Sequence, residues 1–216
     1  MTDRVLVPRK NAVSVVALAT TASVLFVALT VLVMAHLTGT IDRDLILSLR
    51  ADATPTLTAF LLGVTFTSGK LGIPFVILFT AILYRQYGAR TAAYYVGACV
   101  SAELVNAILK HVVTRVRPHG VSPLLTAAGG YSFPSADAML AVVIFGLGTL
   151  LLTSSLRSSA LRLAAIGAAG LFVIAAAVAR VYLGAHWPSD VLGGVLAGTA
   201  CGAFWLGALR RSTTAT

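Results

Sequence analysis

The stretch Val178-Ala-Arg-Val-Tyr-Leu-Gly-Ala-His-Trp-Pro-Ser-Asp190 joins two apolar segments, and the rest of the chain is organised around it. Because proline fits the first turn of a helix, we expect a helix to begin at Pro188. His186 and Asp190, four residues apart, then meet on one face, where the carboxylate can select one imidazole tautomer while the other nitrogen acts as a nucleophile. Arg180 adds a planar donor fork suited to phosphate. The alternative is an ordinary arginine at a membrane surface beside a structural His-Asp pair.

The composition is that of an integral membrane protein, since 58% of the 216 residues are hydrophobic and only 11% are charged. A helix needs about 20 apolar residues to cross a bilayer. Runs of this kind predict an all-α bundle of six spanning helices in a single membrane-embedded domain, residues 1–216, with spans at 12–37, 71–86, 90–112, 136–154, 161–183 and 189–209. The apolar stretch 55–68 is short, and we expect an interfacial or re-entrant helix there rather than a seventh crossing.

The basic residues indicate topology. The net charge of +9 does not favour nucleic-acid binding, because these residues lie mostly at the ends of apolar segments. The first segment follows a basic leader at 1–11 and lacks a small-x-small cleavage pattern, so we expect an uncleaved span. The end of the bundle that holds the N-terminus collects Arg4, Arg9, Lys10, Arg85, Arg90, Arg157, Arg162, Arg210 and Arg211. The other end holds Arg43, Arg50, Lys70 and Arg115, besides three cations with a chemical role, Lys110, Arg117 and Arg180. The positive-inside rule then predicts cytoplasmic termini and an outward-facing site in the cytoplasmic (inner) membrane of a bacterium.

The third span carries polar residues within apolar sequence. Glu103, Asn106 and Lys110 recur at i, i+3 and i+7, so they stack near one helical face. Ionisable groups there cost about 2.5 to 3.5 kcal/mol each on insertion scales, so we expect them to face the bundle or a polar cavity. The alternative for Glu103 and Asn106 is a structural seam between helices. Cys99 and Cys201 also fall inside spans, where we expect neither a disulfide nor a metal site.

Two further motifs supply groups that suit an anion. Lys110 is followed after six residues by Arg117-Pro118, which leaves both cations about two turns apart, able to reach one anion. After a glycine-containing loop at 119–131, Ser135 is a natural N-cap for the fourth span, and the free N–H groups of a helix start attract anions. The alternative for Ser135 is an ordinary capped helix.

Together the three motifs resemble the type 2 phosphatidic acid phosphatase superfamily, which also includes soluble vanadium haloperoxidases and acid phosphatases. That family's signature reads Lys-x6-Arg-Pro, then Pro-Ser-Gly-His, then Ser-Arg-x5-His-x3-Asp. Here the first motif is intact at 110–118 and the third at 180–190, with Ala179 in place of the serine. The second reads Pro134-Ser-Ala-Asp137. The resemblance extends to the layout of six spans and so covers nearly the whole chain.

The resemblance implies roles for these residues. His186 would form a phosphohistidine, oriented by Asp190, in a metal-independent lipid phosphatase without a cofactor. The phosphate would be bound, and the charge in transfer stabilised, by Lys110, Arg117, Ser135 and Arg180. The substrate would be a lipid phosphate of the bilayer, with a polyprenyl diphosphate first and phosphatidate or phosphatidylglycerophosphate next.

Asp137 departs from the family pattern, because it stands where the family has the histidine thought to protonate the leaving group. A carboxylate among Lys110, Arg117 and Arg180 stays ionised and donates protons poorly. Three hypotheses follow. In the hypothesis that we favour, the leaving group needs little protonation, as is true of the phosphate expelled from a diphosphate. Alternatively, His119 or His111 supplies the proton, or the protein binds phosphate without hydrolysing it.

Two other classes of function fit the same residues. A non-catalytic lipid-phosphate binder or a small transporter would also carry polar residues such as Glu103 and Asn106 within spans. Transporters often contain repeated halves with helices interrupted near the middle of the membrane, and this chain shows no internal repeat. A lipid phosphotransferase would use the same site with a second lipid in place of water.

Overall fold

The computed structural model describes residues 12–69, 72–119 and 130–212, and within these ranges every regular element is a helix. The all-α prediction is confirmed there, whereas the basic leader at 1–11 and most of the loop at 119–131 lie outside the described residues. In chain order the elements are α1 (Ala12–Met34), α2 (Gly39–Ala51), α3 (Pro55–Ser68), α4 (Gly72–Val113), α5 (Ala136–Ala141), the π-helical turn η2 (Val142–Leu147), α6 (Gly148–Leu152), α7 (Ser159–Tyr182) and α8 (Pro188–Ser212).

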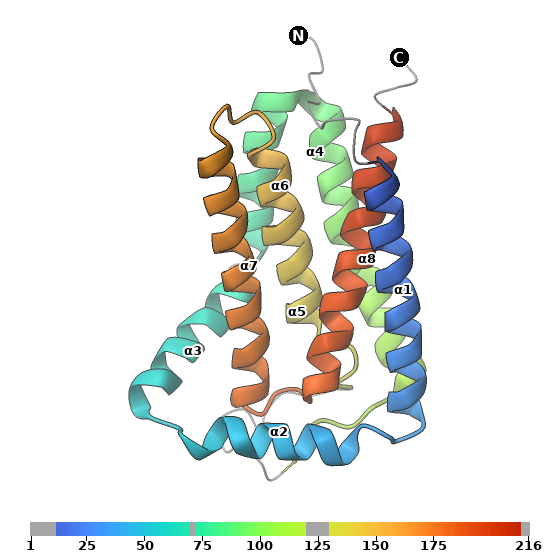
Figure 1. The fold of residues 1–216 in the computed structure, drawn as a ribbon, viewed down its shortest axis with the longest axis vertical. Coiled ribbons are helices and arrows are strands. Elements are labelled where there is room, and N and C mark those ends of the chain that lie inside the picture. The colour runs from blue at the N-terminus through green and yellow to red at the C-terminus, as the bar shows by residue number, and fades with distance from the viewer. Residues whose placement is uncertain (1–11, 70–71, 120–129, 213–216) are drawn as a thin grey trace.

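The long helices run side by side, and α1 begins at the same end of the bundle at which α8 finishes (Figure 1). α1 packs along α8. At the opposite end α2 crosses the bundle, and Arg50 Nη1 donates to the Tyr182 carbonyl at 3.1 Å, which ties α2 to the end of α7. We call this the α2 end of the bundle.

α4 is a single element of 42 residues that the chain folds into two legs. A straight helix of this length would measure about 63 Å, twice the roughly 30 Å of a bilayer core. Gly88 breaks it with φ 86° and ψ 177°, a conformation that glycine adopts without a steric cost. The first leg leads away from the α2 end and the second returns toward it (Figure 1). The legs correspond to the predicted spans 71–86 and 90–112.

Four helices in the described part of the chain are long and apolar enough to cross a membrane, namely α1 from Ser14, α4, α7 and α8. Much of their surface is apolar; Leu163 and Leu171 of α7, for example, are 72% and 70% exposed. The six predicted spans do not appear as six long helices, because α4 joins two of them and the helical stretch Ala136–Leu152 is shorter than the others. α3, with 14 residues, is also short, as expected.

The stretch from α5 through η2 to α6 forms the centre of the bundle and contacts α4, α7 and α8. Its inward side chains, including Ala138, Met139 and Val143, are fully buried. Cys99 and Cys201 are free thiols in α4 and α8.

Two glycines let α8 approach this central stretch closely. A Cβ atom added to Gly194 would lie 2.4 Å from the Ser135 carbonyl oxygen, and one added to Gly198 would lie 2.6 Å from the Met139 carbonyl oxygen. Real Cβ atoms do not come so near, so both positions require glycine for this packing. For Gly202 the nearest atom would be 3.8 Å away, an ordinary contact.

We expect Gly194→Ala to lower the Tm of the detergent-purified protein, because overpacking a tight contact costs about 1–3 kcal/mol. Gly167→Ala in α7 is the matched control, since nothing lies within 4 Å of the added Cβ. Alanine favours a helix over glycine by roughly 1 kcal/mol, so the Tm of this control should hold or rise. A Tm for Gly194→Ala equal to that of the control would contradict the close contact.

Candidate active site

Three segments of the chain meet at the α2 end: the residues after α4, the residues before α5, and the turn between α7 and α8. The Ser132 N–H donates to the Arg115 carbonyl at 2.8 Å, and the Ser135 N–H donates to the Asp190 carbonyl at 2.9 Å. Asn106 Nδ2 of α4 donates to the Pro134 carbonyl at 3.1 Å, so its side chain faces the bundle as predicted. These bonds bring the three sequence motifs together.

His186 lies in the turn before α8, is only 2% exposed, and has a partner on each ring nitrogen. Nδ1 lies 2.9 Å from the Ser132 carbonyl oxygen, which can only accept a hydrogen bond. Nε2 lies 3.2 Å from Nη1 of Arg117, which can only donate one. A neutral ring with its proton on Nδ1 satisfies both contacts. Nε2 then carries the lone pair and is the nucleophilic atom of the ring.

Asp190 is fully buried, and its carboxylate is held from both sides. Oδ1 accepts from Arg115 Nη1 at 2.6 Å, and Oδ2 accepts from the Trp187 N–H at 2.8 Å. The distance from Oδ2 to His186 Nδ1 is 3.6 Å, too long for a hydrogen bond. The contact expected to select the tautomer is therefore made by Ser132, while Asp190 adds negative charge beside the ring.

The pKa values at the site reflect burial. Loss of water lowers the pKa of His186, the nearby Asp190 carboxylate acts to raise it, and the Arg117 cation lowers it further. Burial also lowers the pKa of Arg117, with Asp190 opposing this effect and Arg180 adding to it. An arginine remains charged at neutral pH even so. The neutral imidazole of His186 thus lies beside the permanently charged guanidinium of Arg117.

Arg117 is fixed by backbone carbonyls. Its Nη1 donates to the Ala185 carbonyl at 2.7 Å, and its Nε donates to the Gly130 carbonyl at 3.3 Å. Lys110 lies in the last turn of α4 and is partly buried. The sharing of one anion by Lys110 and Arg117 stays a prediction.

The second motif and the neighbouring Arg180 each contain a buried polar atom that forms no hydrogen bond with the described residues. Ser135 is the N-cap residue of α5, as predicted, but its buried Oγ caps no N–H and has no hydrogen-bond partner among the described residues. Asp137 forms an ion pair with Arg180 of α7. The buried Nε of Arg180 likewise finds no acceptor in the part of the chain that the structure describes. The Ser135 hydroxyl and the Arg180 Nε–H are therefore candidate donors to a ligand.

Three residues considered as supporting groups, Glu103, His111 and His119, are exposed. Glu103 is exposed, contrary to expectation, because it follows the buried Ala102 and is rotated about 100° away from the buried face of α4. His111 Nδ1 lies 2.8 Å from the Ala107 carbonyl, and its ring packs edge-on against Tyr131. His119 is exposed. For Glu103 and His111, which lie on α4, the sequence alone does not fix the rotation about the helix axis.

Sequence reasoning missed Arg115, which joins two carboxylates. Besides Asp190, its guanidinium contacts Asp42 of α2, with Nη2 2.6 Å from Oδ2. Asp42, which the sequence analysis did not single out, is buried. The available signal was a third cation within the first motif, since a buried arginine needs acidic partners. Across the described residues no three His, Cys, Asp or Glu side chains gather as a metal would require.

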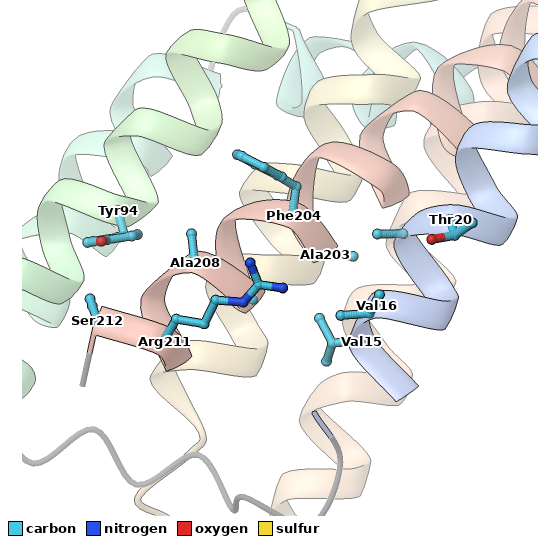
Figure 2. Close-up of a pocket in the computed structure, with 11 residues that line it drawn as sticks. Val15, Val16, Thr20, Tyr94, Ala203, Phe204, Ala208, Arg211 and Ser212 are labelled. Carbon is cyan, nitrogen blue, oxygen red and sulfur yellow. The ribbon is translucent and has the colours of Figure 1, made fainter. Parts of the chain in front are cut away.

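A groove lies at the other end of the bundle, near the end of α8. It has a volume of about 560 Å³ and is lined by α1, α4 and α8. Figure 2 shows Arg211 and Phe204 on α8 with Val15 and Val16 of α1 nearby. None of the residues that line it belongs to the three motifs.

Comparisons by sequence identify related proteins. The family model of the PAP2 superfamily matches residues 91–213. Phosphatidylglycerophosphatase B of Bacillus subtilis (strain 168) is 36% identical over 93 residues, which are 42% of this chain and only 44% of that protein. The match therefore spans less than half the length of that relative.

Two solved structures share the fold. One is the crystal structure of the first transmembrane PAP2 type phosphatidylglycerolphosphate phosphatase from Bacillus subtilis, with a TM-score of 0.82 at 22% identity, covering 90% of this chain and 96% of that one. The other is Aquifex aeolicus LpxE, with a TM-score of 0.60 at 23% identity, covering 76% and 93%.

We expect the imidazole of His186 to stay neutral, with its proton on Nδ1, when the pH falls to the ordinary histidine pKa of about 6.5. The reason is the lowered pKa of this buried ring. Nitrogen NMR of the ¹⁵N-histidine-labelled protein in detergent checks this, with His186→Gln assigning the signal. A ring that is already half protonated at pH 6.5 or above would contradict the geometry.

Proposed function

Because this chain belongs to the PAP2 superfamily, whose model matches more than half of it, we propose that it is a membrane lipid phosphatase. The observation that carries the proposal is the contact between His186 and Arg117, in which a neutral Nε2 lies 3.2 Å from a guanidinium. Phosphoryl transfer depends mainly on positioning and on stabilising charge, so a buried nucleophile beside a fixed cation suits it. The phosphatase named among its relatives supports the same class of reaction.

The reaction proceeds in two steps. In the first, His186 Nε2 attacks the phosphorus, and the N–P bond forms as the P–O bond to the leaving group breaks. Arg117 then donates to a phosphate oxygen, and the Ser132 carbonyl and the Asp190 carboxylate stabilise the positive charge on the ring. In the second step, water attacks the phosphorus as the N–P bond breaks, and the proton that the water loses passes to the surrounding solvent. Inorganic phosphate leaves, and the neutral imidazole is restored.

The charge of the phosphate is met by side chains of the protein. Lys110, Arg117 and Arg180 bind its oxygens, and the Ser135 hydroxyl adds a donor. The buried Oγ of Ser135 and Nε of Arg180, which have no partner among the described residues, support this assignment because such groups are costly unless a ligand satisfies them. We propose that these cations carry the transfer in a metal-independent enzyme.

The ion pair of Asp137 with Arg180 favours a diphosphate substrate. A carboxylate in an ion pair accepts hydrogen bonds and has no proton of its own to give, so it protonates a leaving alkoxide poorly. The phosphate expelled from a diphosphate leaves without that help. The leading substrate class is a polyprenyl diphosphate such as undecaprenyl diphosphate. Phosphatidylglycerophosphate follows, in keeping with the name of the relative, and then phosphatidate.

We further propose six crossings, with the two legs of α4 and the stretch from α5 to α6 each counted as a span. α3 then lies at the interface or re-enters it. The excess of basic residues at the end that holds the termini supports cytoplasmic termini and a site that faces outward from the cytoplasmic (inner) membrane.

Phosphate release by the detergent-purified protein, without added metal, tests the function. We expect a higher kcat/KM for undecaprenyl diphosphate than for phosphatidate, and at least about a 10³-fold loss in His186→Ala, because the nucleophile is gone. His111→Ala, which alters an exposed histidine, is the control and should keep its activity. Lipid binding without release from any of these substrates would instead support a non-catalytic binder, and transfer to an added lipid alcohol would support a phosphotransferase.

Asp137→His restores the residue that the family carries at this position. We expect it to raise phosphate release from the monoester phosphatidate, about 10-fold or more, relative to the diphosphate, because a general acid typically contributes 10²–10⁴-fold. Asp137→Asn removes the charge without adding a general acid, so phosphate release from phosphatidate should stay slow. If wild type hydrolyses both substrates equally well and Asp137→Asn changes neither rate, the assignment of a diphosphate loses its basis.

A further inference from the structure

Asp42 of α2 is buried at the α2 end, and each of its oxygens accepts hydrogen bonds. Oδ1 accepts from the Ser189 N–H at 2.8 Å. Oδ2 accepts from the Ser189 hydroxyl at 2.6 Å and from Arg115 Nη2 at 2.6 Å. A side chain from the first quarter of the chain is thus bonded to Ser189 at the start of α8, three residues after His186.

These contacts hold the helix that carries Asp190. Ser189 is the second residue of α8, and its N–H belongs to the first turn, where no carbonyl of the same helix is available. Asp42 caps this N–H from a different helix, as a local N-cap residue would. The Ser189 hydroxyl also accepts from Arg115 Nη1 at 2.7 Å, so the serine is fixed between the carboxylate and the guanidinium.

Arg115 extends the contact to Asp190. One guanidinium nitrogen, Nη2, donates to Asp42 and the other, Nη1, donates to Asp190, both at 2.6 Å. Two carboxylates therefore share one cation. A single Arg–Asp pair would cancel the charge of Asp190, whereas this arrangement keeps a net negative charge beside His186, whose ring becomes positive when Nε2 forms a bond to phosphorus.

We propose that Asp42 and Arg115 are positioning residues, which hold Asp190 in place and keep it effective as the counter-charge of His186. The proposal rests on the phosphatase function proposed above. Neither residue is among the groups that bind the phosphate, and both act through Asp190. α2 is then part of the catalytic apparatus, besides connecting α1 to α3.

Asp42→Asn tests the proposal, since it keeps the size of the side chain and removes its charge. We expect kcat for phosphate release to fall about 10- to 100-fold, as is typical when catalytic groups are slightly misplaced, with KM within about twofold. Asp44→Asn, on the exposed side of the same helix, is the matched control and should match wild type. Arg115→Lys should lose a similar factor, because an ammonium lacks the fork that reaches both carboxylates.

A double-mutant cycle separates positioning from a general loss of structure. If Asp42 acts through Asp190, Asp42→Asn should cost nothing further in a protein that already carries Asp190→Asn. Additive losses in kcat, or an Asp42→Asn enzyme with the kcat of wild type, would overturn the proposal. Gel filtration and the Tm of each variant show whether it has folded.

A second readout does not depend on turnover. The ring ¹⁵N signals of His186 at pH 7 should move in Asp42→Asn and stay in place in Asp44→Asn. If wild type itself releases no phosphate, the proposed function has failed, and these signals alone decide whether Asp42 acts on the His186 ring. Unchanged signals in folded Asp42→Asn protein would overturn the positioning role whatever the activity.

Discussion

The hydrogen bond from the Ser135 N–H to the Asp190 carbonyl joins the starts of the two helices on which the site is built. It forms because α8 has no side chain at Gly194, where a Cβ atom would collide with the Ser135 carbonyl oxygen. The same approach brings the Ser132 carbonyl to within 2.9 Å of the His186 ring. The protonation pattern of His186, the proposed nucleophile, therefore depends on how closely two helices pack.

Charge alternates along the buried side chains of the site. Arg117 contacts the neutral ring of His186, Asp190 lies on the other side of that ring, and Arg115 separates Asp190 from Asp42. Unpaired charges in a low-dielectric interior are strongly destabilising, so this order allows several ionised groups to share a small volume. The order also explains why the site lies at the end of the bundle, where loops and α2 bring in polar groups that lipid-facing helices lack.

Much of the fold follows from the sequence because a chain in lipid must satisfy its backbone hydrogen bonds locally, which makes each long apolar run a helix. The start of α8 at Pro188 and the break near Gly88 follow from the backbone preferences of proline and glycine. Asn106 faces the bundle, as its polarity within an apolar run indicated.

The sequence could not predict which face of a helix a given side chain occupies, nor which residues far apart in the chain make contact. Glu103 and Asn106 differ by less than one turn of helix, yet only one of them is buried. Arg115 and Arg117 look equivalent in the first motif, whereas one meets carboxylates and the other meets the imidazole. The burial of Asp42 depends on a partner 147 residues away, which no local pattern reveals.

The arrangement of the chain ends has a practical side. α1 begins and α8 finishes at the end of the bundle opposite the α2 end (Figure 1), whereas His186 precedes the start of α8. An affinity tag or a fluorescent protein attached there would stay clear of the residues that carry the chemistry. Such fusions suit purification, surface immobilisation and imaging in cells, and they leave the α2 end accessible to a lipid.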